Sequence, residues 1–190
     1  MKKIMILIIT FTFVACGPRS AEKNESKSNK NDSIQTQENK SEVKDFEKLG
    51  SNLMKNETLN GLKIGLKVSD LKNMLGEPSN KTKNELWGAD GEYHQTYEYG
   101  KQGIELDMIG KKEADKTINM ITIVSPCDYK TSKGISIGTN YQQVKQAYIE
   151  FYNPEFSNSE SLVAGSVFGG VIFSFENSKV KTIFIGANAE

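Results

Sequence analysis

The chain has 190 residues, with 24 Lys and Arg against 24 Asp and Glu, so its formal net charge is zero. This length gives room for one ordinary domain with a tail. Nucleic-acid binding needs a basic surface, and the balanced charge gives no reason to expect one, so no nucleic-acid partner is predicted.

The first 15 residues have the pattern of an export signal. Two lysines precede an apolar run over residues 4–14, and Ala15 is the small residue before Cys16. This order of segments is typical of a signal peptide that is removed after export. The apolar run is shorter than the roughly 20 residues that span a bilayer. We therefore predict a lipoprotein signal peptide over residues 1–15.

Residues 13–16, Phe-Val-Ala-Cys, resemble the lipobox of bacterial lipoproteins. The resemblance implies cleavage before Cys16 and a diacylglycerol on its sulfur, which anchors the chain to a membrane. Gly17 stands where an Asp retains Gram-negative lipoproteins in the inner membrane, so the resemblance implies the outer membrane of the cell envelope, at its periplasmic face or the cell surface. The alternative is an ordinary signal peptide followed by an incidental cysteine. Cys127 is the only other cysteine, so lipidation of Cys16 leaves no intrachain disulfide.

Residues 16–56 are predicted to be the lipidated cysteine and a disordered polar tether. Residues 17–48 hold seven basic and seven acidic side chains with few apolar ones, which is too little apolar surface to fold. A flexible coil of about 40 residues spans roughly 35 Å and would hold a folded part clear of the lipid. Asp32-Ser33-Ile34 resembles an O-glycosylation sequon, with a plain linker as the favoured interpretation. Apolar residues at positions 43, 46, 49 and 53 also allow a short amphipathic helix, which Gly50 weakens.

Residues 57–126 are predicted to be a first unit of one helix and a β-meander. An apolar stripe predicts a helix over residues 68–75, which Gly76 ends and Pro78 prevents from continuing. Residues 79–92 are interpreted as a polar loop. Alternating apolar residues predict strands over residues 93–99, 103–109 and 117–124.

Residues 127–190 are predicted to be a second unit of the same kind. Asn140, with Gln143 three residues later, is typical of the capped start of a helix. Strands are predicted over residues 162–168, 170–175 and 180–185. Asn177 and Ser178 form the tight turn between the last two.

The two units align as a tandem repeat. Gly61, Gly65 and Leu71 match Gly134, Gly138 and Val144, and Ile121 and Ile123 match Ile183 and Ile185. The predicted fold class is therefore α+β, with two tandem repeats that form one globular unit, each a short helix followed by an antiparallel β-meander.

This pattern resembles the BamE (SmpA/OmlA) family of outer-membrane lipoproteins and the tandem-repeat fold of the β-lactamase inhibitor protein. The residues that carry the resemblance are Gly65, Leu71, Gly76, Pro78, Tyr97 and Tyr99 in the first unit and Gly138, Val144, Lys179, Val180 and Ile183 in the second. BamE proteins assist a β-barrel assembly complex, and the inhibitor grips an enzyme with a concave sheet. The resemblance implies binding of a protein. None of the inhibitor's contact residues is matched, so inhibition of a β-lactamase is not implied.

The sequence offers little for catalysis. His94 is the only histidine, which excludes a multi-histidine metal site. Cys127 is the one nucleophile that His94 could activate, and Asp90 and Glu92 lie close to His94 in sequence. Nothing local gathers these groups, so we interpret the thiol as packed and the carboxylates as solvated. No catalytic residue, cofactor or metal is predicted.

The aromatic residues Trp87, Tyr93, Tyr97 and Tyr99 are the candidate interaction residues, because Trp and Tyr are enriched at binding hot spots. Places in the sheet core are the favoured alternative for them. We predict a non-enzymatic, membrane-anchored envelope lipoprotein that binds a protein or envelope component through a sheet face or this aromatic loop. The alternatives are an outer-membrane assembly accessory of the BamE type and an enzyme with a site at Cys127 or a carboxylate pair.

Overall fold

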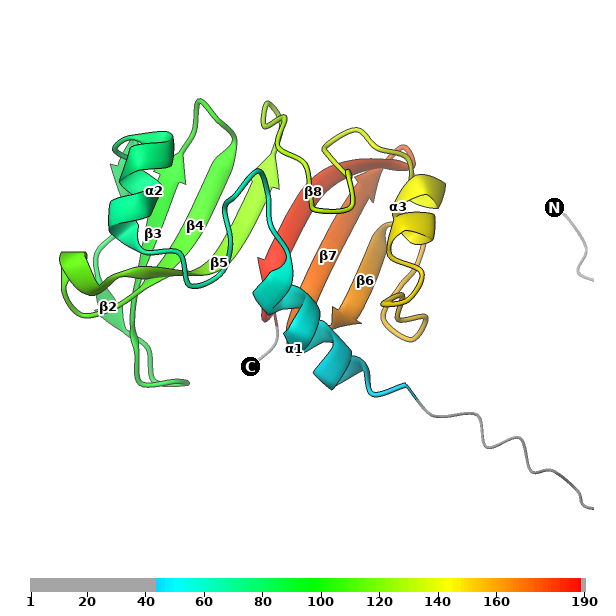
Figure 1. Ribbon diagram of the computed structural model, residues 1–190, viewed down its shortest axis with the longest axis horizontal. Helices are drawn as coiled ribbons and strands as arrows, with labels where there is room; N and C mark the ends of the chain where they lie inside the picture. The colour runs from blue at the N-terminus through cyan, green and yellow to red at the C-terminus, as the bar shows by residue number, and fades with distance from the viewer. Residues whose placement is uncertain (1–43, 189–190) are drawn as a thin grey trace, which may run out of the picture. The chain divides into compact units, whose positions relative to one another are not determined.

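The structure is a computed structural model that describes residues 44–188. The predicted signal peptide, Cys16, Asp32-Ser33-Ile34 and the tether up to residue 43 lie outside the described residues. The described part is α+β, as predicted, and combines three α-helices with an antiparallel sheet (Figure 1). Its elements in chain order are α1 (Phe46–Asn56), α2 (Val68–Leu75), β1 (Asn80–Lys81), β2 (Glu85–Leu86), β3 (Tyr93–Tyr99), β4 (Ile104–Ile109), η1 (Glu113–Asp115), β5 (Thr117–Val124), α3 (Tyr141–Ala147), β6 (Ser161–Ser166), β7 (Gly169–Glu176) and β8 (Lys179–Gly186).

One sheet contains all eight strands. Its order is β1-β3-β4-β5-β8-β7-β6, and β2 pairs with β3 off this path. α2 precedes the antiparallel meander of β3, β4 and β5, and α3 precedes that of β6, β7 and β8. The last strands of the two meanders pair in the middle of the sheet, where Ile121 faces Ile185 and Ile123 faces Ile183. The six long strands lie within two residues of the predicted ranges.

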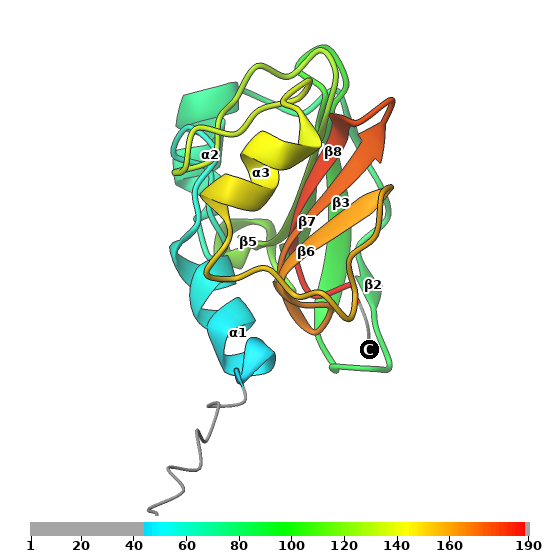
Figure 2. The same ribbon diagram turned by 90° about the vertical axis from the view of Figure 1, so that its right-hand side faces the viewer.

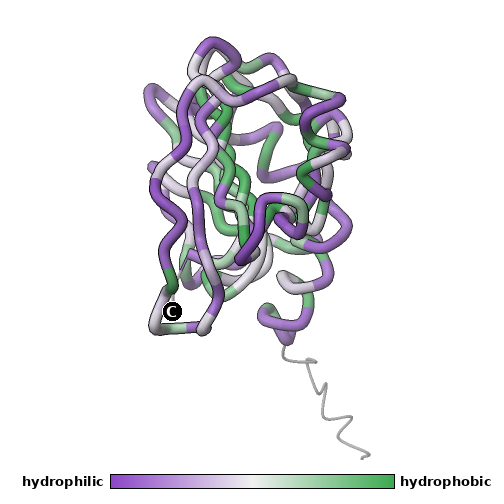
Figure 3. The backbone as a smooth tube through the Cα atoms, turned by 90° about the vertical axis from the view of Figure 1, so that its left-hand side faces the viewer, coloured by the Kyte–Doolittle hydropathy of each residue, from purple (hydrophilic) through white to green (hydrophobic). Residues whose placement is uncertain are grey.

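The three helices lie on one side of the sheet (Figure 2). Successive residues of a strand point to opposite faces. On β4, Ile104, Leu106 and Met108 are buried under the helices, whereas Glu105 and Asp107 point away from them. Apolar residues gather where the sheet meets the helices (Figure 3). Among the described residues, no helix covers the opposite face of the sheet.

Local sequence signals set the ends of the helices and the tightest turn. Gly76 ends α2 with φ of 76°, a conformation that favours glycine. The Asn140 side chain accepts a 3.0 Å hydrogen bond from the backbone N–H of Gln143 at the start of α3. Asn177 and Ser178 have φ of 53° and 60° in the two-residue turn between β7 and β8. These three predictions are confirmed.

Helix α1 corrects the predicted tether, which was drawn as far as residue 56. The amphipathic helix allowed by the sequence is present, and it packs against β6 and β7. Gly50 makes this contact possible, because a Cβ there would lie 2.0 Å from the carbonyl oxygen of Gly169. Leu53 is buried in the same contact. Residues 46–56 therefore belong to the folded part. Glycine weakens an isolated helix, but here its missing side chain lets the backbone of α1 approach the backbone of the sheet.

Two short strands correct the polar loop predicted over residues 79–92. In β1, Asn80 pairs with Glu98, and in β2, Glu85 pairs with His94. Each strand has only two residues, so neither contains the apolar alternation that reveals a strand in a sequence. They add to the outer edge of β3 and place residue 87 and the loop after it beside that strand.

Candidate functional site

Within residues 44–188, no helix covers the face of the sheet opposite α1, α2 and α3. We call it the open face and define it by those strand residues pointing away from the helices that are half-buried or exposed: Thr96, Glu98, Glu105, Asp107, Met120, Thr122, Val124, Ile172, Ser174, Thr182 and Phe184. The sheet edges are less available. The two-residue strands β1 and β2 cover β3. On the other side, the segment after α3 bonds to β6 through the N–H of Asn153 and the carbonyl of Phe151. Binding by strand addition is therefore disfavoured relative to binding on the face.

An apolar patch occupies the middle of the open face. Phe184 on β8 is the register partner of Ile172 on β7 and of Thr122 on β5. A Cβ at Gly186 would lie 2.8 Å from Cγ of Met120 and 3.0 Å from the ring of Phe184, so both side chains lie close over this glycine. The sheet therefore presents a contiguous apolar patch to the exterior.

Acidic side chains border this patch on β3 and β4. Glu98 and Glu105 are directly opposite each other in the antiparallel pair. Neither carboxylate forms a salt bridge with a residue of the described range. Like charges in directly opposed positions destabilise a sheet. The arrangement thus carries an electrostatic cost that no salt bridge within residues 44–188 offsets.

At the β3 end of the open face, Trp87 stacks on His94. The ring centres are 3.8 Å apart and the ring planes differ by 8°. His94 is on β3, and Trp87 follows β2, the short strand that pairs with it. The indole covers the imidazole and leaves His94 only 3% exposed, whereas Trp87 itself is 37% exposed. The stack therefore fixes an exposed aromatic surface beside the sheet.

Two carboxylates hold the imidazole ring of His94. Nδ1 lies 2.8 Å from Oδ2 of Asp107, which also accepts a hydrogen bond of 2.9 Å from the amide of Asn119. Nε2 lies 2.9 Å from Oδ2 of Asp90. The backbone N–H of Glu92 and the His94 ring hold the pKa of the Asp90 carboxyl below its usual value. Both ring nitrogens therefore face acceptors, an arrangement that the doubly protonated, cationic ring satisfies.

The loop that carries Asp90 is folded by its own backbone. The N–H of Trp87 donates to the carbonyl of Glu92 at 2.9 Å, and the N–H of Gly91 donates to the carbonyl of Trp87 at 3.1 Å. The other carboxylate oxygen of Asp90 accepts the N–H of Glu92 at 3.0 Å. Beside this loop is a depression of about 340 Å³, lined by Thr82, Lys83, Glu85, Trp87, His94, Gln95, Thr96 and Asp107.

The four aromatic residues that were predicted as interaction candidates occupy two kinds of position. Trp87 is exposed at the open face and Tyr93 is half-buried. Tyr97 and Tyr99 are 0% and 1% exposed, so the prediction that they could contact a partner is wrong for these two. They point under the helices. The Tyr97 hydroxyl donates to Glu113 at 2.7 Å, and the Tyr99 hydroxyl donates to the carbonyl of Gly76 at 3.3 Å.

The pKa values of these groups follow from burial and hydrogen bonding. Burial, with the nearby carboxylates, raises the pKa of Tyr99 to about 12. Burial also acts to raise the pKa of Glu113, but hydrogen bonds from Lys81 and Tyr97 outweigh it and lower that pKa to about 2. Lys81 lies 2.6 Å from Glu113. The cluster supports the core and offers no free acid or base.

The possible pair of Cys127 and His94 is not assembled. His94 is opposite Ile109 at one end of β4, whereas Cys127 lies beyond β5, whose Ile123 is opposite the other end of β4. Cys127 is buried, and this burial raises the pKa of its thiol. Within residues 44–188, no three His, Cys, Asp or Glu side chains are arranged to hold a metal ion.

Sequence reasoning missed Asp107 and misplaced Asp90. Asp90 was interpreted as a solvated carboxylate and no role was predicted for Asp107, yet both bond to His94. The sequence contained part of the information needed to find this site, because the only histidine and the only tryptophan of the chain lie seven residues apart. Only the hairpin register adds Asp107, since it places β4 beside β3.

Comparison with known proteins identifies no relative. No family model matches the chain, and neither a curated protein nor a solved structure is significantly similar to it.

Proposed function

We propose that this protein is a non-enzymatic, membrane-anchored envelope lipoprotein that binds a partner protein on the open face. The observation that carries the proposal is the distribution of the helices, which cover one face of an eight-stranded sheet and leave the other uncovered. A sheet face with exposed apolar side chains is commonly a place of contact with another molecule. Trp87 adds an aromatic anchor at its end.

The chemistry of the open face favours one kind of partner. Met120, Ile172 and Phe184 offer an apolar centre, and Glu98 and Glu105 an acidic border. Protein interfaces combine an apolar core with a polar rim, and complementary charge adds specificity. We infer a partner with an apolar patch bordered by Lys or Arg, since such a border would relieve the opposed carboxylates.

We also infer that the two halves are tandem repeats of the kind in the β-lactamase inhibitor protein. Equivalent hydrogen bonds support this inference. In the first half, the N–H of Gly65 donates to the carbonyl of Ile118 at 2.7 Å, and in the second, the N–H of Gly138 donates to that of Val180 at 2.8 Å. The ladder irregularities also recur at equivalent places, between Asp107 and Met108 and between Ser174 and Phe175.

The anchor and the compartment stay proposals that rest on the first 17 residues. Cys16 would carry the lipid, and the predicted tether would connect it to the folded part. Within the described range, each helix is too short or too polar to cross a membrane. We place the protein at the outer membrane because of Gly17. Labelling with a radioactive fatty acid tests the lipid anchor, and a Cys16→Ser variant that still incorporates the label would contradict it.

Pull-down from detergent-solubilised envelopes tests the binding role. The full-length lipoprotein is used as bait, beside Ile172→Arg on the open face and Ile149→Arg two residues after α3. Both variants place the same charge on an isoleucine that is not buried. We expect a partner to be captured by wild type and by Ile149→Arg, and to be lost with Ile172→Arg.

Equal capture by the two variants would contradict binding on the open face. Circular dichroism and thermal unfolding confirm that both variants are folded before the comparison. If the lost partner is a component of a β-barrel assembly complex, the protein is an assembly accessory of the BamE type rather than a binder of a soluble protein. Elution by salt checks the acidic border, because charge pairs at a rim are screened.

A further inference from the structure

The only histidine of the chain lies under its only tryptophan, at the edge of the surface proposed to bind the partner. His94 is almost completely buried, and each ring nitrogen is within 2.9 Å of a carboxylate oxygen. An ionised carboxylate accepts hydrogen bonds and donates none. Both contacts of His94 are therefore hydrogen bonds only when the ring carries two protons.

We propose that His94 is a pH-sensitive clamp that fixes the Trp87 loop, residues 87–92, on the sheet when the ring is charged and releases it when the ring is neutral. The inference rests on the proposed function, since it concerns the regulation of the same surface. Histidine changes charge between about pH 5 and 8, so a modest change of pH would operate the clamp. A neutral ring keeps one N–H and turns the lone pair of its other nitrogen toward a carboxylate.

Several carboxylates surround His94. Asp107 on β4 and Asp90 in the loop contact it directly, and Glu85 on β2 is its register partner. Glu92 adds an exposed carboxylate to the loop. On β5, the nearest contributor is the neutral amide of Asn119, which bonds to Asp107.

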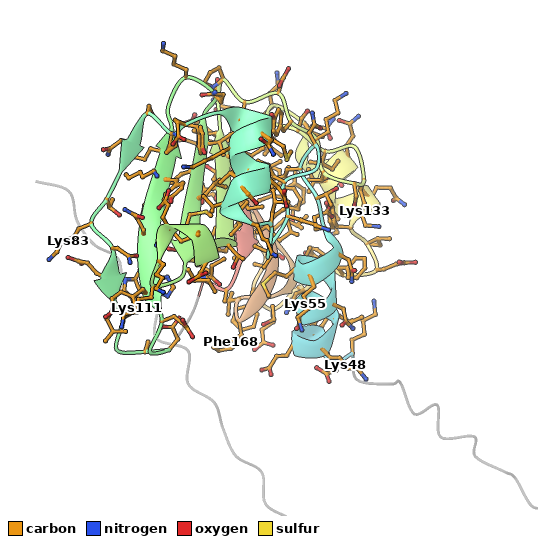
Figure 4. All side chains as sticks on the ribbon, turned by 60° about the vertical axis from the view of Figure 1, so that its left-hand side comes forward. Lys48, Lys55, Lys83, Lys111, Lys133 and Phe168 are labelled. Carbon is orange, nitrogen blue, oxygen red and sulfur yellow. The ribbon has the colours of Figure 1, made fainter. Side chains whose placement is uncertain are left out.

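Three lysines lie at this end of the sheet and oppose that field, and Figure 4 labels two of them, Lys83 and Lys111. The third, Lys116, is 2% exposed, donates to Asn84 and to the carbonyl of Gly110, and acts on Asp107 through its charge. Lys83 is 3.5 Å from Glu85, which offsets its charge. The ammonium of Lys111 lies over the ring of Tyr93, 5.7 Å from its centre. Because Tyr93 and His94 are successive strand residues, Lys111 is on the opposite face of the sheet from the imidazole. Asp90 and Asp107 are therefore the charged groups in direct contact with the imidazole.

The two carboxylates are not equally free to move. Asp107 is on a strand with neighbours on both sides, its side chain is 10% exposed, and Asn119 bonds to it. The Asp90 side chain is 46% exposed and belongs to a loop. Loss of a proton at Nε2 would therefore release Asp90 rather than Asp107. The loop would then lose its one side-chain bond to the sheet. The indole of Trp87 could leave His94, while the backbone bond from the N–H of Trp87 to Glu92 keeps the hairpin closed.

Fluorescence of the single tryptophan tests the clamp, because its intensity reports the charge of the ring beneath the indole and a shift of its emission to longer wavelength reports release of the indole into water. Contact with a cationic imidazole quenches indole emission, so the emission of the full-length protein should be low at about pH 5 and rise toward pH 8. The rise should be lost in His94→Gln. In Asp90→Asn, which changes an exposed residue, the midpoint should move to lower pH because one of the two charges that stabilise the cation is removed. Asp70→Asn on α2 is the matched control and should follow wild type.

A wild-type emission that stays constant over this range would overturn the clamp, and so would a rise that Asp90→Asn leaves unmoved. A second measurement tests the effect of the clamp on binding separately. Capture of the partner should weaken between about pH 5.5 and 8 in wild type and not in His94→Gln. If emission titrates and no partner is captured at either pH, the binding role fails and the clamp stands. If capture is pH-independent and emission is flat, the clamp fails and the binding role stands.

Discussion

Replacing Gly50 by alanine separates what α1 needs as an isolated helix from what it needs in the fold. Alanine is favoured over glycine in a helix interior by about 1 kcal/mol, so propensity alone predicts a more stable protein. In the structure, a Cβ on Gly50 would lie 2.0 Å from the carbonyl oxygen of Gly169 and 2.7 Å from the backbone nitrogen of Ser166. These are backbone atoms of the sheet that cannot turn aside, so α1 has to shift.

The magnitude follows from what a shift of α1 disturbs. Overpacking of a tight contact costs about 1–3 kcal/mol. Leu53 is buried by the same packing, and full exposure of a leucine costs about 1.5–3 kcal/mol more. After the propensity gain is subtracted, we expect Gly50→Ala to lower the free energy of unfolding by about 1.5–5 kcal/mol.

Urea unfolding followed by circular dichroism measures this difference. Asn52→Ala in the same helix is the control, because position 52 is exposed and alanine there should leave stability unchanged or raise it by a few tenths of a kcal/mol. If Gly50→Ala is as stable as wild type or more stable, the close approach of α1 to the sheet is not as described, and the assignment of residues 46–56 to the folded part loses its physical basis.

Three further predictions concern charges and hydrogen bonds. Glu98→Gln should raise the free energy of unfolding by about 0.2–1 kcal/mol, because it removes repulsion from Glu105, and it should weaken partner capture. Thermal unfolding would show the gain in stability and pull-down the loss of binding. A loss of stability would contradict the repulsion. Tyr148→Phe should lower the free energy of unfolding by about 1–3 kcal/mol, because the Tyr148 hydroxyl donates at 2.7 Å to the carboxylate of Glu57, which is 1% exposed. Urea unfolding measures the difference, and an unchanged midpoint would show that the carboxylate does not need this hydrogen bond. The pKa of Glu113 falls from 4.5 to about 2 on folding, so its contribution to stability is complete above about pH 4.5 and is lost as pH falls toward 2. The stability difference between wild type and Glu113→Gln should therefore shrink on acidification across that range, and a constant difference would refute the assignment.

Much of the fold could be predicted from the sequence because its signals are local. Alternation over six to eight residues identified the strands, and Gly76 and Asn140 gave the end of α2 and the start of α3. β1 and β2 gave no such signal, because each has two residues and is a strand only by virtue of its pairing with β3. The place of α1 was equally hidden, since Gly50 is unfavourable in a helix until the sheet lies against it.

The candidate site shows the same division. By itself, the sequence determined that one tryptophan, one histidine and three tyrosines lie close together in the chain, and that the long strands alternate in polarity. Only the tertiary structure decided which of those aromatic residues face a partner, because all three helices pack on one side of the sheet and bury Tyr97 and Tyr99 beneath them. It also decided the surroundings of His94, because hairpin register brings in a carboxylate 13 residues away. A sequence specifies conformation over a few residues through backbone and rotamer preferences, whereas burial and charge pairing depend on which segments meet in space.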